Sequence, residues 1–491
     1  MEQPGEGPGR AFDDRQRSLV ERIGRRGPFD LTDGTLVVLP SITFPAEELR
    51  KIIAIQHYEE RLLFLTLLLR SEGLRMVFLT SCEIDEAVVD YYLGFLPDPQ
   101  SARSRLTLGA LGDPLPRALS TKLLERPGAL EELRERIPDR DNACLLTFNV
   151  TKMEQQIGEA LGIPLYGPDP SLVPLGSKSG SRLAAREAEV PVLEGAEDLY
   201  SLLAVEEGIG QVREHRPDAE AVVVKLNNGF SGQGNAIIEL TDVRSPLDSS
   251  QVVFCASEES WPSFSGKIEA EGAIVEELVR PHPTSPSVQL QISATGEVAV
   301  TSTHDQILGG PDDQVYLGCR FPARADYRGI IAGKGERVAR YLAEQGVVGP
   351  FGIDFVVLPG ATARPRCMLS EINLRMGGTT HPFHMARLVT GGEYDADTGE
   401  LIADGRSKCY VATDNLKSER YIGMTPNMVI DRLQKVGLAF DPHTKVGTTL
   451  HLLGALEGFG KLGMVCIADS PDAAQELFEQ SVAEVDELAL D

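Results

Sequence analysis

The residues best suited to chemistry lie in the segment SEINLR, residues 370–375. Glu371, Asn373 and Arg375 are spaced two apart, and alternate residues of a β-strand point to the same face. The apolar segment FGIDFVVL upstream contains one acid, Asp354. If the two segments pair, two carboxylates and an amide oxygen converge, and two like charges about 4 Å apart repel by about 4 kcal/mol at an effective dielectric near 20. Such a cluster takes up a proton or binds a cation, and oxygen ligands of this kind suit Mg²⁺. The alternative is a structural salt bridge between Glu371 and Arg375.

The segment VVVKLNNGFSGQGN, residues 222–235, predicts a strand followed by a loop that cradles phosphate. Gly229, Gly232 and Gly234 let backbone N–H groups approach an anion, and Lys225 adds a positive charge at the mouth of the loop. The lysine precedes the glycines, so this is not the nucleotide-binding loop G-x-x-x-x-G-K-[ST]. By itself the pattern is more often that of an ordinary hairpin.

Two further segments could contact a nucleotide. IVEELV, residues 274–279, is an apolar strand whose backbone could meet an adenine edge while Glu276 or Glu277 reaches the amine or ribose. The simpler interpretation is a half-exposed strand. Lys178 opens a helix after a Gly-Ser turn and could touch a phosphate, although a solvated lysine explains it as well.

The first third of the chain predicts a parallel α/β domain over residues 31–170. Near-continuous apolar strands alternate there with helices, which implies a sheet covered on both faces. No G-x-G-x-x-G follows its first strand, so separate dinucleotide binding is not expected. The expected strands are 34–40, 75–80, 143–148 and 163–166, and the expected helices are 46–70 and 152–161.

The remainder predicts an α+β domain and a smaller α/β unit. Alternating segments around Ala-Thr-Gly indicate a hairpin. The boundaries predicted are 171–404 for the α+β domain, divided into a nucleotide lid at 176–280 and a metal-binding part at 281–404, and 405–491 for the last unit. The expected helices are 196–214, 326–345, 380–389, 426–436 and 471–488, and the expected strand pairs are 288–293 with 297–302 and 352–358 with 367–373.

Composition excludes several classes of protein. The chain has 491 residues and a formal net charge of −26, which disfavours nucleic acid or an anionic membrane as the main partner. Its seven cysteines lack C-x-x-C spacing and are expected to be reduced thiols. Residues 1–30 are expected to be a mobile segment without the apolar core of a signal peptide, so we expect a cytoplasmic enzyme. A homodimer is the base-rate expectation for assembly.

The order of these motifs resembles the ATP-grasp superfamily of carboxylate-amine ligases. Five of them follow in sequence over about 200 residues: Lys178, Lys225 with its glycine loop, VEELV, GID and E-x-N-x-R. The resemblance implies ATP and Mg²⁺ as cofactors and two α+β subdomains that grip ATP. It implies phosphate contacts from Lys178 and Lys225, a closing loop with Gly229, Ser231, Gly232 and Gly234, an adenine site at Glu276, Glu277 and Leu278, Mg²⁺ at Asp354, Glu371 and Asn373, and Arg375 on the transferred phosphoryl group.

A wider resemblance covers nearly the whole chain. The N-terminal unit is similar to a pre-ATP-grasp domain, and STHDQILGG, LRMGGTTHP and the unit after residue 405 resemble the pheganomycin-type peptide ligases. One departure is that RPHPTSP follows VEELV without the acid that many members place on the ribose. The resemblance implies joining of a carboxylic acid or modified amino acid to a peptide amine, as in peptide antibiotic biosynthesis.

The expected reaction passes the γ-phosphoryl of ATP to a carboxylate, and an amine then attacks the acyl phosphate to give an amide, ADP and phosphate. Lys225 and Arg375 would stabilise developing charge. For proton removal we consider His304 and Asp305, although a structural contact is equally plausible. The expected substrate contacts are Gln306, Gly377, Gly378, Thr379, Thr380 and His381. The alternatives are a ligase that makes a dipeptide or a carboxylate-thiol product, and a non-catalytic nucleotide-binding partner protein.

Overall fold

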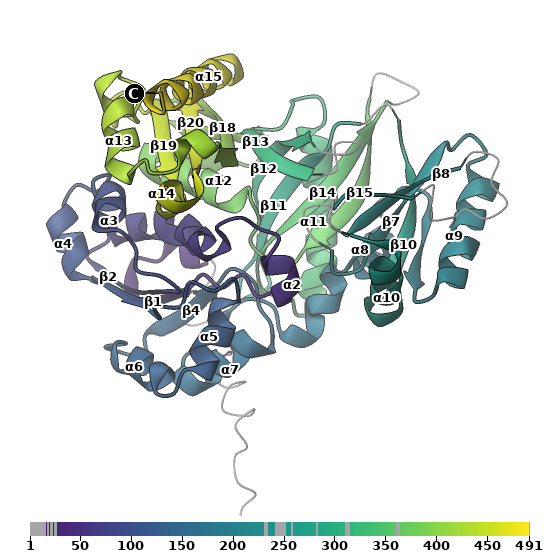
Figure 1. Cartoon of the computed structure of the whole chain (residues 1–491), viewed down its shortest axis with the longest axis horizontal. Helices are drawn as coiled ribbons and strands as arrows, with labels where there is room; N and C mark the ends of the chain where they lie inside the picture. Colours follow the sequence, from purple (N-terminus) through teal and green to yellow (C-terminus); the bar gives the residue numbers. More distant parts are fainter. Residues whose placement is uncertain are drawn as a thin grey trace, which may run out of the picture.

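Three sheets make up the frame of the molecule (Figure 1). The computed structural model describes residues 16, 19, 23, 27–229, 234–240, 252–256, 259–280, 283–309, 315–359 and 364–490. Within these residues the N-terminal unit, the central sheet and a smaller sheet on the opposite side follow one another across the molecule. The mixture of one parallel and two largely antiparallel sheets confirms the predicted α/β and α+β fold class.

The N-terminal sheet is parallel, as its apolar strands predict. Its described strands follow the order β3-β2-β1-β4-β5, so that β1 pairs with both β2 and β4. Strand β1 is buried from Leu36 to Leu39, since helices cover both faces of the sheet. The strands are β1 (Asp33–Leu39), β2 (Gly73–Thr80), β3 (Leu106–Ala110), β4 (Ala143–Thr147) and β5 (Leu165–Tyr166), and the helices are η1 (Pro28–Asp30), α3 (Glu86–Leu93), α4 (Pro99–Ser104), α5 (Leu119–Glu125), α6 (Ala129–Glu135) and α7 (Lys152–Leu161).

The single helix expected over residues 46–70 is wrong, because the chain turns in its middle. Helix α2 covers only Ala46–Leu49, and the 3₁₀ helix η2 begins at Ile55 and ends at Arg70. Ala54 between them adopts a left-handed conformation, with φ of 60°, which no helix can continue through. The turn brings residues 51–53 to the cavity described below.

The second sheet is antiparallel and belongs to the predicted nucleotide lid. Its order is β6-β10-β7-β8-β9, with helix α9 packed on β6 and β10. The expected helix at 196–214 is partly wrong, since its first residues form the edge strand β6 against β10. The elements are η3 (Pro170–Gly176), α8 (Lys178–Glu187), β6 (Gly195–Leu199), α9 (Leu202–His215), β7 (Ala221–Leu226), β8 (Asn235–Glu239), β9 (Val252–Phe254), α10 (Trp261–Glu271) and β10 (Ala273–Leu278).

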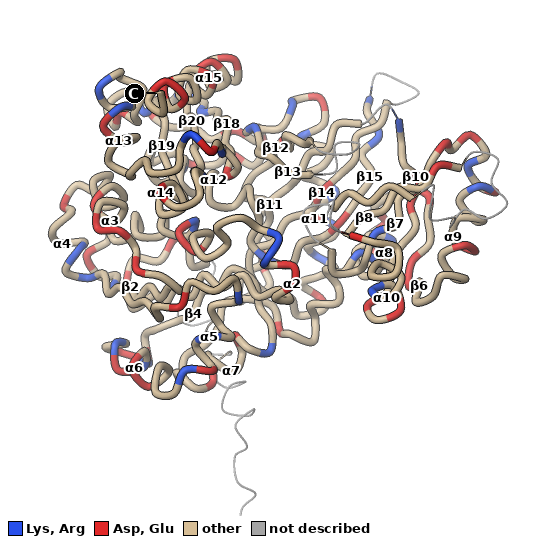
Figure 2. The backbone as a smooth tube through the Cα atoms, in the orientation of Figure 1, with Lys and Arg blue, Asp and Glu red and all other residues tan. Residues whose placement is uncertain are grey.

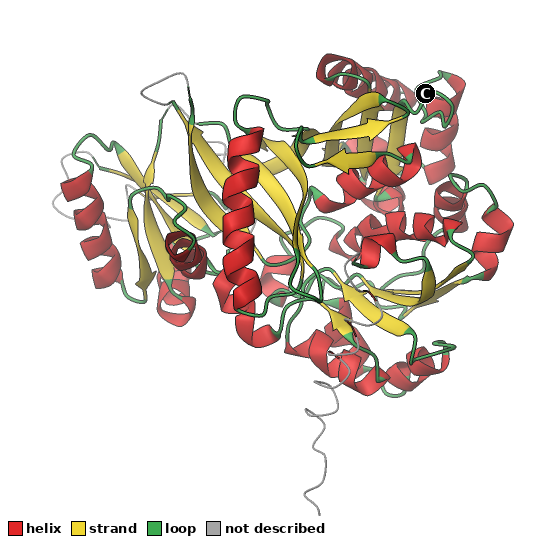
Figure 3. Ribbon diagram, turned by 180° about the vertical axis from the view of Figure 1, so that it is seen from behind, coloured by secondary structure: helices red, strands yellow, loops and turns green. Residues whose placement is uncertain are grey.

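The central sheet contains the strands on which most of the predicted chemistry lies. It runs β15-β14-β11-β12-β13-β18-β17-β16 through the described residues, and the predicted hairpin forms between β11 and β12. Helix α11 packs across the back of β11 and β12 (Figure 3). The elements are β11 (Pro286–Ile292), β12 (Val298–Gly309), β13 (Val315–Phe321), α11 (Arg328–Glu344), β14 (Gly349–Leu358), β15 (Arg366–Asn373), α12 (Thr380–Thr390), β16 (Glu393–Asp395) and β17 (Glu400–Ala403).

The C-terminal unit continues the central sheet and shares a core with the N-terminal unit. Strand β20 pairs with β18, which pairs with β13, so hydrogen bonding extends past residue 405. Leu62 and Leu65 of η2 belong to the same buried cluster as Leu453 and Met464. The predicted domain boundaries remain predictions. The elements are β18 (Arg406–Lys417), η6 (Glu419–Tyr421), α13 (Pro426–Lys435), β19 (Gly447–His451), η7 (Leu453–Ala455), α14 (Leu456–Phe459), β20 (Lys461–Ala468) and α15 (Pro471–Leu488).

Charged residues of both signs are interspersed along the chain (Figure 2). Among the described residues, no helix has the length and apolar character needed to cross a bilayer.

Candidate active site

A cavity of about 470 Å³ lies where the three sheets meet. The lid contributes one wall, including Lys178 and Lys225, and the central sheet contributes another, including Asp354. The third wall comes from the two end units, with Arg61 of η2 and Lys461 of β20. The cavity thus has a lid end, and a far end between the N-terminal and C-terminal units.

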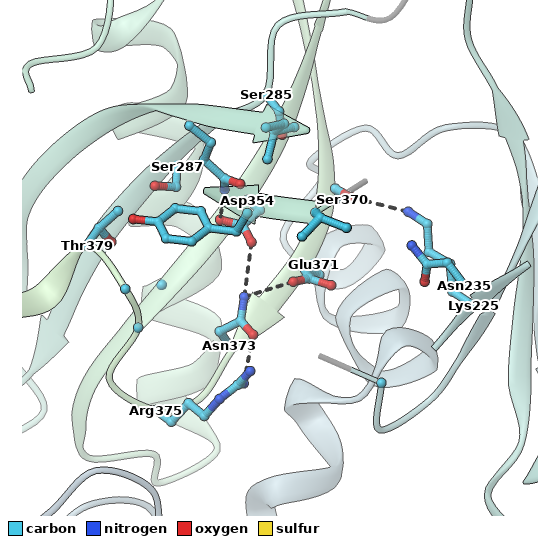
Figure 4. A pocket seen from close by; sticks show the side chains of 18 of the residues that line it. Lys225, Asn235, Ser285, Ser287, Asp354, Ser370, Glu371, Asn373, Arg375 and Thr379 are labelled. Atoms are coloured by element: carbon cyan, nitrogen blue, oxygen red, sulfur yellow. Dashed lines mark hydrogen bonds between the residues drawn. The ribbon is translucent and has the colours of Figure 1, made fainter. Parts of the chain in front are cut away.

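The predicted pairing of two carboxylates is present at the lid end. Asp354 of β14 and Glu371 of β15 are directly opposite one another in the antiparallel register, so their side chains share a face. Asn373 bridges them, donating from Nδ2 to Asp354 Oδ2 and to Glu371 Oε1, at 3.1 Å in each case. Arg375 Nη1 donates to Asn373 Oδ1 at 2.7 Å. Figure 4 shows these four side chains in succession along one wall.

The two carboxyl groups differ in their pKa values. Burial raises the pKa of Asp354 well above its usual value, and the charge of Glu371 adds to the rise. Burial acts in the same direction on Glu371, but the charges of Lys178 and Lys225 and the hydrogen bonds from Lys178 and Asn373 together outweigh it, and the pKa falls to about 2. A cation beside both groups would favour the ionised form of Asp354 as well.

The two predicted lysines reach this cluster from the lid. Lys178, the first residue of α8, forms an ion pair with Glu371 and donates to the Gly229 carbonyl at 3.2 Å. Lys225 of β7 extends toward Ser370 Oγ at 3.5 Å, as Figure 4 shows, and forms an ion pair with Glu276 at 2.7 Å. The structural salt bridge considered between Glu371 and Arg375 is replaced by these contacts.

The residues proposed for adenine lie side by side on β10, but their side chains differ in role. Leu278 and Glu277 line the cavity, and Glu277 forms an ion pair with Arg216 at 2.5 Å. Glu276 is fully buried and held between Lys225 and Arg182 Nη1, the latter at 2.8 Å. Its Oε2 accepts from Lys225 Nζ at 2.7 Å, and Glu276 lines the cavity as well, so its predicted contact with the adenine or ribose stays a prediction.

The ends of the glycine loop approach each other closely. A Cβ on Gly234 would lie 2.8 Å from the Gly229 Cα, so only glycine permits this crossing. Gly229 lines the cavity beside Lys178. Ser231 and Gly232, the other predicted loop contacts, lie outside the described residues.

Four of the residues predicted to bind substrate line the cavity. Gln306 Nε2 donates to Asp354 Oδ1 at 2.8 Å, and Gly377, Gly378 and Thr379 form the turn that follows β15. Thr380 and His381 do not line it. Thr380 Oγ1 accepts from the Gly377 amide at 2.9 Å, and the His381 ring meets His451 with Nε2 atoms 2.9 Å apart.

The structure does not bring His304 and Asp305 to the cavity or to each other. Neighbouring residues of β12 point to opposite faces, so His304 is buried against the Tyr410 hydroxyl, at 2.6 Å. Asp305 accepts from the Tyr327 hydroxyl at 2.6 Å and from the Arg324 amide at 3.1 Å. Burial lowers the pKa of His304 to about 3. The alternative considered for His304 and Asp305 was a structural role, and each residue does make a structural hydrogen bond, to Tyr410 and to Tyr327 respectively.

Sequence reasoning missed the far end of the cavity altogether. Arg61 Nη1 donates to Asp414 Oδ2 at 3.1 Å, and Lys461 Nζ donates to the Tyr58 hydroxyl at 2.6 Å. The only local signals were an arginine in the apolar segment RLLFLTLLL and polar residues late in a strand, ATDNLK. Neither pattern indicates a site, because the partners lie more than 350 residues apart.

This arrangement is suited to phosphoryl transfer to a bound acid. Carboxylates that can hold a cation lie opposite two lysines, and Arg375 reaches the same space, so negative charge on phosphate oxygens would be neutralised from both sides. The cavity extends beyond this point to the far end, which leaves room for a second molecule.

Family models match two parts of the chain. A model described as IQCH-like, ATP-grasp, matches residues 247–397, and a model described as the PGM1 C-terminal domain matches residues 428–481. The IQ motif-containing protein H of Danio rerio is 21% identical over 351 residues, 59% of this chain and 32% of that protein.

Solved structures support the same fold. An ADP complex of N5-carboxyaminoimidazole ribonucleotide synthetase is 14% identical, with a TM-score of 0.54 over 93% of this chain and 98% of that chain. The complex of biotin carboxylase from Campylobacter jejuni with an ATP analogue is 12% identical, with a TM-score of 0.56 over 93% of this chain and 94% of that chain. At these identities the likeness concerns the fold alone.

One relative is similar along nearly its full length. The L-propargylglycine–L-glutamate ligase of Streptantibioticus cattleyicolor is 31% identical over 471 residues, which are 93% of this chain and 95% of that ligase. Together with the family models and the geometry of the cavity, this similarity shows that the chain belongs to the ATP-grasp superfamily of carboxylate-amine ligases, in the family that includes this amino-acid ligase.

Proposed function

We propose that this chain uses ATP and Mg²⁺ to join the carboxylate of one amino-acid-like substrate to the amine of another. The observation that supports this most directly is the convergence of Asp354, Glu371 and Asn373 opposite Lys178 and Lys225 in one cavity. A structural salt-bridge network would not require a cavity at this point, nor room beyond it for further molecules.

The residues present fit a magnesium ion. Asp354 and Glu371 offer oxygens that are already held within reach of one another by the shared Asn373 contact. Two carboxylates and one amide leave several positions of an octahedral ion to water and phosphate oxygens, which is how Mg²⁺ commonly binds. Asn373 directs its amide nitrogen at the carboxylates, so its oxygen would join the ligands only after the amide turns over. The ion would neutralise charge on the phosphate oxygens.

The reaction has two stages. A carboxylate oxygen of the first substrate attacks the γ-phosphorus, the bond to the β-γ bridging oxygen breaks, and ADP leaves. The amine of the second substrate then attacks the acyl carbon, phosphate leaves with the electrons of the C–O bond, and the nitrogen loses a proton. Lys178 and Lys225 would hold phosphate oxygens, while Arg375 is placed to stabilise the transferred group.

The wall of the cavity must also exclude water, because an acyl phosphate hydrolyses. We assign this role to the lid sheet, whose unit brings Lys178, Lys225 and Gly229 to the cavity wall. The corresponding domain proposal is an N-terminal unit at 31–170, an ATP-grasp unit at 171–404 and a C-terminal unit at 405–491.

For the substrates, the relative's name indicates two α-amino acids, and we extend that class to this chain. A peptide amine remains the alternative second substrate. A carboxylate-thiol product would need a thiol to replace the amine. A nucleotide-binding protein without catalysis is disfavoured, since both lysines and all three proposed metal ligands are present.

The test is a product assay. Purified protein, ATP and Mg²⁺ are mixed with pairs drawn from a panel of amino acids and short peptides, and ADP, phosphate and new amides are followed by chromatography and mass spectrometry. We expect equimolar ADP, phosphate and amide. AMP and pyrophosphate as products would contradict the acyl-phosphate route, and no product from any pair would contradict the ligase assignment for this substrate class.

A further inference from the structure

The far end of the cavity contains a group of charged residues that the phosphoryl-transfer scheme does not use. We call Arg61, Lys461, Tyr58 and Asp414 the cationic subsite. Both cations are almost fully buried, Arg61 at 7% exposure and Lys461 at 4%. The four residues come from η2, β18 and β20, so the subsite exists only where the N-terminal and C-terminal units meet.

Positive charge exceeds negative charge there. Arg61 and Lys461 lie beside Asp414, and Lys417 lines the same wall and adds a third positive charge. The other carboxylates of the described cavity lining belong to the lid end, where each faces a lysine, an arginine or the proposed metal. A buried cation without a matching anion is costly, so an anionic group in this space would be stabilised.

Hydrogen-bond donors also remain available at the subsite. Arg61 Nε is buried without a hydrogen-bond partner among the described residues. Lys461 Nζ donates to Tyr58, and an ammonium has three donors. Tyr58 and Phe148 hold the Arg61 guanidinium over their rings, with its Cζ 4.6 and 5.0 Å from the two ring centroids. The guanidinium is therefore fixed in place before any ligand arrives.

Amide formation between amino acids leaves a group that such a subsite would bind. Propargylglycine has one carboxylate and glutamate has two, so one amide bond between them consumes one carboxylate and leaves two. Any dipeptide product likewise retains at least one. This unreacted carboxylate must lie near the reacting atoms, and Arg61 lines the same cavity as Arg375.

We propose that the cationic subsite binds the unreacted carboxylate of an amino-acid substrate through Arg61 and Lys461. The inference rests on the proposed function and adds the recognition of the substrate. Asp414 serves to position Arg61 and to offset part of the charge, so that the subsite is stable when no ligand is bound. Either the acid substrate or the amine substrate could supply the carboxylate.

The test compares free acids with their amides. The full-length protein with Mg²⁺ and ADP is titrated by calorimetry with L-glutamate against L-isoglutamine and with L-alanine against L-alaninamide, each pair differing only at the α-carboxylate. We expect the wild type to bind at least one acid about tenfold more tightly than its amide, the effect of a charge-assisted hydrogen bond. A preference for the free acid in either pair supports the subsite.

Three variants make the test specific. Lys461→Met removes the charge and keeps the length of the side chain, and the preference for the acid should fall below about threefold. Lys408→Met is the matched control, since Lys408 is a buried lysine of β18 that pairs with Asp469 and does not line the cavity. Asp414→Asn should preserve or increase the preference, whereas a subsite that binds an ammonium would lose affinity.

The outcomes separate the two proposals. Equal binding of acids and amides by the wild type, binding of none of the four compounds, or an unchanged preference in Lys461→Met would each overturn the subsite. The release of ADP and phosphate by the wild type is measured independently, so a ligase without this subsite and a subsite without ligase activity give different results.

Discussion

The two ends of the cavity differ in their balance of positive and negative charge. At the lid end, Lys178 pairs with Glu371 and Lys225 with Glu276, so cations and anions are closely matched. At the far end, Arg61 and Lys461 lie beside one carboxylate among the described lining residues, that of Asp414. The described lid end therefore holds its cations and anions in matched pairs, while the far end has a surplus of positive charge.

The two ends also differ in how the chain builds them. Asp354, Glu371 and Asn373 lie on two adjacent strands that pair directly. The far end joins residues of the first and last units across a shared hydrophobic core. The three proposed metal ligands are thus positioned by one sheet, whereas the proposed cationic subsite depends on how separate units pack.

The largest effect is expected from Glu371→Gln at the lid end. The change removes a proposed metal ligand and the partner of Lys178, so kcat should fall about a thousandfold or more, measured as ADP release at saturating ATP. Glu400→Gln, which alters a carboxylate paired with Arg328 outside the cavity, is the control. Activity retained within tenfold would remove Glu371 from the metal site.

A substitution at the far end of the cavity is expected to lower the stability of the folded protein. Arg61→Met leaves the Asp414 carboxylate buried without its partner, and the free energy of unfolding should fall by about 3 kcal/mol or more in urea titrations. The double variant Arg61→Met/Asp414→Asn removes the lone charge and should recover part of the loss. If the double variant is as unstable as the sum of the single ones, the two residues are not coupled.

A smaller effect is expected from pH at the far end. Burial lowers the pKa of Lys461 from 10.5 to about 8. The charges of Lys417 and Arg61 add to this lowering, and the charge of Asp414 opposes it. Lys461 Nζ also donates a hydrogen bond to the Tyr58 hydroxyl. Between about pH 8 and 10.5 the unfolded chain binds more protons than the folded one, so this lysine makes stability rise with pH in that window.

The measurement for this prediction is a pair of melting curves. As pH rises from about 8 to 10.5, the Tm of the wild type should rise relative to the Tm of Lys461→Met. A constant Tm difference for Lys461→Met would mean that its pKa is not lowered.

The smallest effect is expected from Asp305→Asn. Asp305 contacts Tyr327 and the Arg324 amide outside the cavity, so kcat should stay within about twofold of wild type. The measurement is the same assay of ADP release. A loss comparable to that of Glu371→Gln would restore Asp305 as a catalytic candidate. Residues outside the two ends of the cavity would then contribute to catalysis.

Much of the fold could be predicted because its signals are local. The parallel N-terminal sheet followed from apolar strands alternating with helices, and helix α15 from its periodicity. The helix expected over 46–70 failed because a left-handed Ala54 has no mark in the sequence. The strand β6 was missed because it is a short edge strand without alternating apolar residues, and it is held by pairing with β10 and by packing of α9, both of which are tertiary contacts.

What the sequence by itself determined is the lid end, since residues two apart on a strand share a face and the order of motifs identifies the superfamily. Only the tertiary structure could decide that His304 and Asp305 point away from the cavity, and that Arg61, Asp414 and Lys461 meet. The physical reason is that strand geometry is fixed by the backbone between neighbouring residues. Contacts across more than 350 residues are fixed by the packing of whole units, which no local pattern records.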